Sequence, residues 1–199
     1  MTEPSATIVV TGGPGGGKTT ALDLFQRELK SAVKIVPEAA TLLFGHGLDR
    51  DVGDGHPLPL QRSIYRMQVE LEDIFRSCYP RRLLICDRGT LDGLAYWPGD
   101  EPSYFASLGT TYEREAARYG AVIFFQSAAI HGEDVRSNNP YRSEDSRTAA
   151  LLDERLRRVW ERHPGFHYIP TETSFMRKIN RGLAAIAHAM ESMRGRDAG

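Results

Sequence analysis

Residues 12–20 read Gly-Gly-Pro-Gly-Gly-Gly-Lys-Thr-Thr, and from Gly12 to Thr19 they match the phosphate-binding loop pattern G-x-x-x-x-G-K-[ST]. Glycines suit such a loop because they tolerate positive φ angles and let backbone amides approach a polyphosphate closely. We expect Lys18 to reach the β and γ phosphates and the Thr19 hydroxyl to bind Mg²⁺. The stretch therefore predicts that a nucleoside triphosphate binds here, through Gly13, Gly15, Gly16, Gly17, Lys18, Thr19 and Thr20.

The sequence on either side of the loop has the arrangement that this motif requires. Residues 6–11 form a short apolar, β-branched run that is typical of a buried strand, and residues 20–30 follow with apolar side chains at helical spacing. A loop between a strand and a helix lies at the helix N-terminus, where free amides and the macrodipole favour an anion. A flexible Gly/Pro turn without a ligand would give no reason for Lys18 and Thr19 at that offset.

Composition limits the classes of protein to which the chain can belong. Its 199 residues are 41% hydrophobic, enough for one sizeable core but short for two full domains, so we expect residues 1–199 to form one domain. The formal net charge of −1 implies no global attraction to nucleic acid or to an anionic membrane. Neither cysteine lies in a metal-ligand spacing, and no leader or membrane-spanning run is visible. These features predict a cytoplasmic protein whose partner is a small anion.

The alternation of strand and helix patterns predicts a three-layer α/β fold. Strands are expected at residues 6–11, 33–36, 82–87, 121–126 and 166–170, with at least one helical pattern between consecutive strands. This order is typical of a parallel sheet with helices on both faces. Ligands of such sheets bind beyond the carboxyl ends of the strands. The polar residues that directly follow each strand are therefore the candidates for a shared site.

Two helical patterns are long enough to predict their buried faces. Helix 58–78 is expected to bury a stripe of apolar residues spaced three and four apart, namely Leu60, Ile64, Met67, Leu71, Ile74 and Cys78. A C-terminal helix over about 173–194 repeats the spacing and should close one face of the sheet. Residues 45–59 and 131–145 are polar loops, and connections of that length are often functional.

Three charged residues follow the second and third predicted strands. Asp87 ends an apolar run and precedes Arg88, as expected of a carboxylate on the Mg²⁺ side of a phosphate-loop enzyme and of an arginine that neutralises phosphate charge. Glu38 follows the strand 33–36. It is either a helix-start residue, which needs no further function, or a general base that takes a proton from an acceptor hydroxyl. The residues by themselves leave both interpretations open.

Arginines in the second long loop and just after it are candidates for a lid over the triphosphate. Arg142 and Arg147 belong to a segment of about 131–147 that precedes a predicted helix, 144–163. Arginines on such a segment can close over a triphosphate and stabilise its developing charge. They can equally form a solvated surface with the neighbouring Glu144 and Asp145.

Taken together, these motifs resemble the phosphate-loop kinases of nucleosides and nucleotides. More narrowly, three stretches look like the small ATP-binding proteins that carry the AAA label, which are similar to the nicotinamide riboside kinase domain: residues 37–40, residues 86–93 and residues 139–142. The resemblance implies a five-stranded sheet in the order 2-3-1-4-5. It also implies that Glu38 is the general base, Arg88 a phosphate ligand, Arg142 a lid arginine and Gln61 a residue that reads the nucleobase. Deoxynucleoside kinases usually have Ser after the Asp-Arg pair, where this chain has Gly89.

Two functions are compatible with these residues. The first is a kinase that uses Mg²⁺ to transfer a phosphoryl group from ATP or GTP to an unidentified small-molecule acceptor, with Lys18, Glu38, Asp87, Arg88 and Arg142 as its catalytic residues. The second is a switch that binds and slowly hydrolyses ATP or GTP to control a partner protein. The Asn-Lys-x-Asp motif of Ras-like GTPases is missing after the fourth strand, where Gln126-Ser127-Ala128-Ala129 stands. ATP is therefore the favoured nucleotide.

Overall fold

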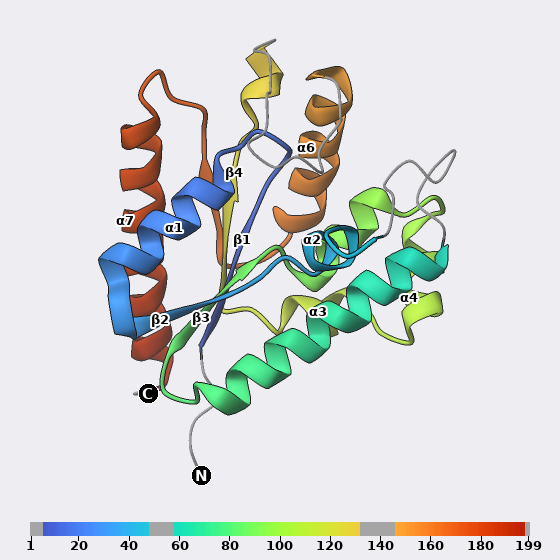
Figure 1. The fold of residues 1–199 in the computed structure, drawn as a ribbon, viewed down its shortest axis with the longest axis horizontal. Coiled ribbons are helices and arrows are strands. Elements are labelled where there is room, and N and C mark those ends of the chain that lie inside the picture. The colour runs from blue at the N-terminus through green and yellow to red at the C-terminus, as the bar shows by residue number, and fades with distance from the viewer. Residues whose placement is uncertain (1–5, 48–57, 132–145, 198–199) are drawn as a thin grey trace.

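The computed structural model describes residues 6–47, 58–131 and 146–197, and within these ranges five parallel strands form one sheet (Figure 1). The strands are β1 (Thr7–Thr11), β2 (Val33–Val36), β3 (Leu83–Asp87), β4 (Ala121–Phe125) and β5 (Phe166–Ile169). Their order is β2-β3-β1-β4-β5, which confirms the predicted topology. The register pairs Val10 with Asp87 and Thr11 with Phe124. The carboxyl ends of the three central strands therefore meet at one edge, where β1 leads into the glycine-rich loop.

Seven α-helices in the described part of the chain surround this sheet. They are α1 (Lys18–Leu29), α2 (Ala39–Phe44), α3 (Leu58–Cys78), α4 (Glu101–Leu108), α5 (Tyr112–Ala116), α6 (Ser146–Trp160) and α7 (Phe175–Asp197). Three short 3₁₀ helices join them: η1 (Lys30–Ala32), η2 (Thr90–Tyr96) and η3 (Ala128–His131). Among the described residues no helix is both long and apolar enough to cross a lipid bilayer.

Two hydrophobic clusters hold the layers together, one on each face of the sheet. On the first face, α1 and α7 pack against the strands through residues such as Phe25, Ile179 and Ile186, all nearly inaccessible to solvent. On the second face, α3, η2, α5 and α6 cover the strands, with Leu91 and Trp160 at the centre. The C-terminal helix closes one face of the sheet as predicted. Because both faces are covered, the middle residues of the three central strands are apolar, and polar residues occur only at strand ends.

The buried face of α3 differs from the predicted one. Ile74 is 54% exposed and Cys78 is also exposed, whereas the residues buried on this helix are Gln61, Gln68 and Glu72. The apolar spacing was therefore a poor guide to this helix. The reason is that α3 lies against the polar turn after β3 as well as against the sheet, and its buried amides and carboxylate bind groups there. Leu71 and Phe75 still pack on the second cluster from its margin.

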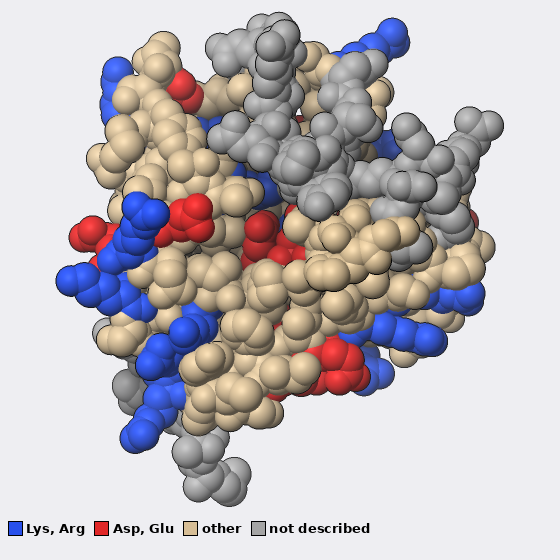
Figure 2. All heavy atoms as spheres, in the orientation of Figure 1, with Lys and Arg blue, Asp and Glu red and all other residues tan. Residues whose placement is uncertain are grey.

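Charged side chains of both signs are spread over the surface. Figure 2 shows Lys and Arg gathered at the lower left, over the end of α1 and around β2, with Asp and Glu interspersed across the same face. Such mixing is consistent with the formal net charge of −1. No single sign of charge dominates the described part of this face.

Candidate active site

The glycine-rich loop joins β1 to the N-terminus of α1. Gly12 has a φ angle of 132°, and a Cβ at this position would lie 2.0 Å from the carbonyl oxygen of Phe125. Only glycine fits there. The Lys18 ammonium is buried and donates hydrogen bonds to the carbonyl oxygens of Gly12 (2.8 Å) and Gly13 (2.7 Å). Thr19 and Thr20 are exposed on the first turn of α1. The loop thus lies at a helix start that is open to solvent, as a phosphate site requires.

A carboxylate from α6 binds the loop from its buried side. Asp153 is 1% exposed, and its Oδ1 accepts hydrogen bonds from the amides of Gly13 (2.7 Å) and Ser127 (2.9 Å). Burial raises the pKa of Asp153, although these two amides oppose the shift. Lys178 on α7 lies on the same side, where its ammonium donates to the carbonyl oxygen of Gln126 (2.6 Å). Burial lowers the pKa of Lys178 to about 8.

Arg88 is the centre of a buried ion-pair network in the turn after β3. Its Nε donates to Glu38 Oε1 at 2.6 Å and its Nη1 to Asp92 Oδ2 at 3.0 Å. Nη1 also lies 3.3 Å from the carbonyl oxygen of Gly12. Burial by itself would lower the pKa of Arg88, but Tyr96, Glu38 and Asp92 outweigh that effect and raise it. The guanidinium therefore stays charged between the glycine-rich loop and Glu38.

The backbone of Arg88 has an uncommon conformation that the surrounding residues hold in place. Its φ angle is 74°, in the left-handed region that non-glycine residues rarely adopt. The amide of Arg88 donates to Val10 O (3.0 Å), and its carbonyl oxygen accepts from Gln68 Nε2 (3.4 Å). Gln68 also donates to Glu72, whose carboxylate accepts from Tyr119 and Arg118 as well. The polar face of α3 therefore supports the turn that presents Arg88.

Trp160, which Asp92 binds, explains why a glycine follows Arg88. The Asp92 carboxylate accepts hydrogen bonds from Thr11 Oγ1 (2.8 Å) and from Trp160 Nε1 (2.6 Å), in addition to its ion pair with Arg88. A Cβ on Gly89 would lie 2.9 Å from two ring carbons of Trp160 and 2.8 Å from a methyl carbon of Val9. The departure from the Ser of the deoxynucleoside kinases is thus accounted for by packing.

Glu38 stands at the start of α2, and its side chain is directed to the turn after β3. It is the N-cap residue of α2, but its side chain accepts no hydrogen bond from that helix's backbone amides. Instead the carboxylate is paired with Arg88 and accepts a hydrogen bond from the Thr41 hydroxyl. The helix start therefore places a carboxylate next to the arginine that contacts the glycine-rich loop.

A cavity lies beside this network. Pro14 of the glycine-rich loop, Glu38, Arg88 and residues of α2, α3 and η2 line it. Gln61 is 4% exposed and faces the cavity, and its amide has no hydrogen-bond partner among the described residues. The other lining residues combine aromatic, apolar, hydroxyl, amide and carboxylate groups: Ala39, Ala40, Phe44, Ile64, Tyr65, Gln68, Gly89, Thr90, Asp92, Gly93 and Tyr96.

The structure brings some of the sequence-predicted residues together and leaves others apart. Glu38, Arg88 and Gln61 line one cavity, and Asp87 ends β3 next to β1. Arg147 is exposed on the first turn of α6. Arg142 lies outside the described residues, as does most of the predicted lid.

Three residues that shape this region were not predicted as site residues. Asp153, Trp160 and Thr11 bind the glycine-rich loop or Asp92. Asp153 carries a signal in the sequence, because it lies on the buried stripe of α6 together with Ala149, Leu152 and Leu156. A carboxylate on an apolar stripe indicates a buried partner. The identity of that partner depends on the fold.

The donor groups near the loop suit Mg²⁺. Hard divalent cations prefer oxygen ligands, and Mg²⁺ commonly keeps several waters and binds substrate phosphates with only one or two protein ligands. The Thr19 hydroxyl on the first turn of α1 and the Asp87 carboxylate at the end of β3, the neighbour of β1, are oxygen ligands of this kind. Within the described ranges no group of three or more His, Cys, Asp or Glu side chains forms a closed metal site. The residues therefore fit a metal that enters together with a nucleotide.

Comparison with known proteins supports the kinase topology. The chain is similar to thymidylate kinase from Candida albicans, with 11% identity, a TM-score of 0.68 and coverage of 94% of this chain and 93% of that one. For thymidylate kinase from Ehrlichia chaffeensis the identity is 18%, the TM-score 0.59 and the coverage 94% and 100%. For a NadR protein in complex with NAD and AMP-PNP the identity is 14%, the TM-score 0.64 and the coverage 93% and 49%, so the chain spans about half of that protein. A comparison with curated proteins finds no match.

The fold and the glycine-rich loop thus place the protein in the class of P-loop NTPase folds. Within that class, a family model described as AAA domain matches residues 7–178. This is most of the chain, and the protein belongs to that family. The predicted resemblance to AAA-labelled, kinase-like proteins is confirmed.

Proposed function

We propose that this protein is a kinase that transfers the γ-phosphoryl group of ATP to a hydroxyl group of a small molecule, with GTP as the alternative donor. The observation that carries the proposal is the cavity bordered at once by Pro14, Glu38 and Arg88. A nucleotide-dependent switch has no need of a second pocket beside its phosphate loop. A kinase needs one, because the acceptor must lie next to the γ phosphate.

Glu38 is suited to the role of general base. In the proposed step the acceptor oxygen loses its proton to the Glu38 carboxylate and forms a bond to the γ phosphorus. The bond between that phosphorus and the bridging oxygen breaks, and the nucleoside diphosphate leaves with the electron pair. The ion pair with Arg88 and the hydrogen bond from Thr41 hold the carboxylate at the edge of the cavity, where such a base must lie.

Arg88 is suited to stabilise the charge that develops on the transferred group. Its guanidinium lies between Glu38 and the carbonyl oxygen of Gly12, and so borders both the cavity and the loop. Because Glu38 and Asp92 hold it in place, the guanidinium needs little reorganisation during the reaction. Bound Mg²⁺, which Thr19 and Asp87 would hold, supplies further neutralisation of phosphate charge.

The charges around the cavity favour an acceptor without a phosphate group. The charged residues among those that line it are Glu38, Asp92 and Arg88, and the arginine is already paired with both carboxylates. A phosphomonoester would bring about two negative charges beside two carboxylates. A neutral or cationic hydroxyl compound avoids this repulsion. Its polar groups can bind the amide of Gln61, which has no hydrogen-bond partner among the described residues.

Lid arginines complete the proposal. In this proposal Arg142 and Arg147 are phosphate ligands, as the sequence suggests, although Arg142 lies outside the described residues. The proposal also treats residues 1–199 as one domain. Arg147 is exposed at the start of α6, so a bound triphosphate would have to draw it in.

The test is formation of nucleoside diphosphate by the purified protein with Mg²⁺ and ATP or GTP. One arm offers unphosphorylated nucleosides and ribosides, and the other offers the corresponding monophosphates. We expect acceptor-dependent turnover in the first arm. Glu38→Gln should lower kcat about 10²- to 10⁴-fold, since it removes the base. Glu28→Gln, the same change on the exposed face of α1, should leave kcat unchanged.

Two results would contradict the proposal. The first is diphosphate formation that no acceptor stimulates and that Glu38→Gln does not slow. The second is turnover with monophosphates alone, which would refute the inference about the acceptor. If the first result came with capture of a partner protein only in the triphosphate state, the switch function would replace the kinase.

A further inference from the structure

The carboxylate of Asp153 lies beneath the glycine-rich loop and is bound to backbone groups of two different loops. Its Oδ1 accepts the amide hydrogens of Gly13 and Ser127, and these residues lie 140 and 26 positions away in the sequence. An unpaired carboxylate is costly to bury, so burial to 1% exposure requires compensating donors. Both donors to Oδ1 among the described residues are main-chain amides of the site. The side chain therefore binds the loop itself.

The peptide groups around Gly13 connect Asp153 to Lys18. The Gly13 amide donates to Asp153, while the Gly13 carbonyl oxygen accepts from the Lys18 ammonium at 2.7 Å and from the Gly16 amide at 3.3 Å. The Gly13 amide also shares one planar peptide unit with the Gly12 carbonyl oxygen, which accepts from the Lys18 ammonium at 2.8 Å. Asp153 holds that amide and in this way fixes the group to which Lys18 is bound.

Ser127 links the same carboxylate to the next residue of the loop. Its amide donates to Asp153, and its hydroxyl donates to the carbonyl oxygen of Pro14. The base of the loop, Gly13 and Pro14, is therefore held from α6 and from the segment after β4 together. A Cβ on Gly13 would lie 2.6 Å from the Asp153 Cβ, which shows how closely the helix approaches the loop.

We infer that Asp153 is a positioning residue of the phosphate loop. It anchors the Gly13 end of the loop so that Lys18 and the amides that follow remain arranged for a polyphosphate, and it does not itself touch the nucleotide. This inference rests on the nucleotide-binding part of the proposed function and is independent of the acceptor. It assigns to α6 the task of holding the loop in its binding conformation.

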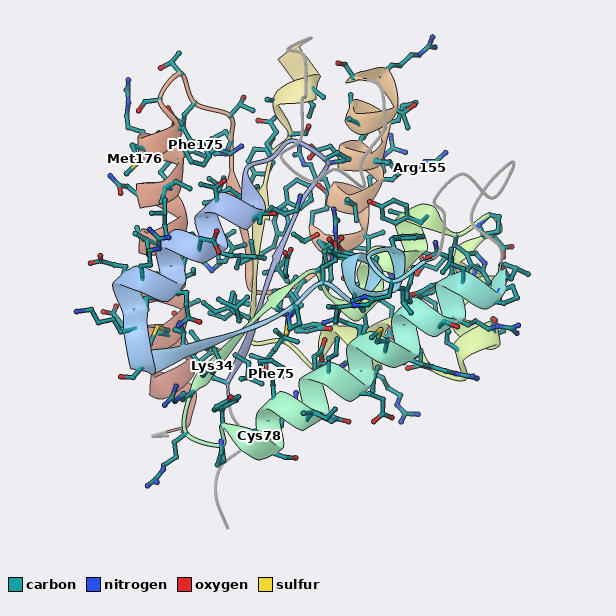
Figure 3. All side chains as sticks on the ribbon, in the orientation of Figure 1. Lys34, Phe75, Cys78, Arg155, Phe175 and Met176 are labelled. Carbon is teal, nitrogen blue, oxygen red and sulfur yellow. The ribbon has the colours of Figure 1, made fainter. Side chains whose placement is uncertain are left out.

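Substitutions at Asp153 separate positioning from stability. Asp153→Ala removes the acceptor of both amides, whereas Asp153→Asn keeps a carbonyl oxygen in the place of Oδ1 and should restore binding. Leu152→Ala changes the neighbouring buried residue and destabilises the same helix, but it leaves both hydrogen bonds to Asp153 in place. Arg155→Ala is the surface control, because Arg155 is exposed on α6 and points away from the loop (Figure 3).

The experiment measures the Kd of Mg²⁺-ADP and Mg²⁺-AMP-PNP by titration calorimetry for the full chain and its variants. We expect Asp153→Ala to bind about tenfold or more weakly, since two hydrogen bonds to a charged acceptor are lost. Asp153→Asn should bind within about threefold of the parent, and so should Leu152→Ala despite a lower Tm. If Asp153→Ala does not fold, Asp153→Glu replaces it, because one extra methylene displaces the acceptor and should weaken binding similarly.

The outcomes distinguish this inference from the proposed function. If the parent protein binds neither nucleotide, both fail. If the parent binds and Asp153→Ala, or Asp153→Glu in its place, binds within about twofold, the positioning role is wrong while nucleotide binding stands. Equal weakening by Leu152→Ala would show that affinity follows stability, and this also overturns the inference. Loss of binding in Asp153→Ala with recovery in Asp153→Asn supports it.

Discussion

The contact between Gly89 and Trp160 gives a prediction that can be worked out in energy terms. A Cβ on residue 89 would lie 2.8 Å from Val9 Cγ2 and 2.9 Å from the Trp160 ring carbons Cη2 and Cζ2. Carbon atoms in good contact are about 3.5–4.0 Å apart. Overpacking of this kind costs about 1–3 kcal/mol, so Gly89→Ala should lower the free energy of unfolding by about 2 kcal/mol.

The partner substitution, Trp160→Phe, has its own cost. It removes the hydrogen bond from Nε1 to the Asp92 carboxylate, whose 2.6 Å length is typical of a strong, charge-assisted bond. Losing a hydrogen bond to a charged group costs about 1.5–3 kcal/mol. It also removes the two ring carbons that a Cβ on residue 89 would meet. The double variant should therefore be less destabilised than the sum of the single variants, by about 1 kcal/mol.

The assay is urea unfolding followed by circular dichroism on all four proteins of the cycle. Trp97→Phe is the matched control, since Trp97 is also buried but its Nε1 donates to Ser103, away from Gly89. Gly89→Ala combined with Trp97→Phe should be additive. If the cycle with Trp160 is additive within about 0.5 kcal/mol, Trp160 does not determine the size of residue 89. The packing explanation for the missing Ser would then be refuted.

Three further predictions concern the site and its surroundings. Between pH 7 and pH 9.5 the unfolding free energy of the parent should rise by about 2 kcal/mol relative to that of Lys178→Met. The reason is that the folded-state pKa of Lys178 is lowered to about 8, so the unfolded chain binds more protons than the folded chain in that pH range. Urea unfolding at both pH values measures this, and an unchanged difference would show that Lys178 titrates normally. Arg88→Lys should lower kcat about 10²- to 10³-fold in the diphosphate assay, because an ammonium cannot reproduce the forked guanidinium that contacts Glu38 and Asp92. Activity near that of the parent would exclude a role of Arg88 in stabilising the transferred phosphoryl group. Gln61→Ala should raise the KM of the acceptor about fivefold or more and leave the KM of ATP unchanged, since the amide faces the cavity. If the variant and the parent had the same KM for the acceptor, Gln61 would have no part in acceptor recognition.

Local patterns were sufficient to predict the central elements of the fold. The run before Gly12 and the helix after Lys18 were predicted correctly, because an apolar strand, a glycine-rich turn and a helix start each depend on neighbouring residues. The strand-end rule then led to Glu38 and Arg88, since parallel strands present their carboxyl ends at one edge. These two residues are 50 positions apart, and they are in contact.

Helix α3 shows where local pattern fails. Its apolar spacing predicted that Ile74 and Cys78 would be buried, but the fold leaves these two residues exposed and buries Gln68 and Glu72. Periodicity reports which residues share a helix face and says nothing about a polar neighbour. The turn after β3 offers the Arg88 carbonyl oxygen and Tyr119 offers its phenol group, so Gln68 and Glu72 are buried beside the half-buried Leu71 and Phe75.

The sequence by itself determined the P-loop class, the parallel sheet and the strand-end residues that face a common edge, because these follow from short-range spacing and from the chirality of strand-helix-strand units. Only the tertiary structure decided that Arg88 is held between Glu38 and Asp92, that Trp160 excludes a side chain at position 89, and that Asp153 binds the loop from α6. Each of these depends on side chains far apart in the sequence that meet when layers pack. These contacts are determined by the packing of the whole core.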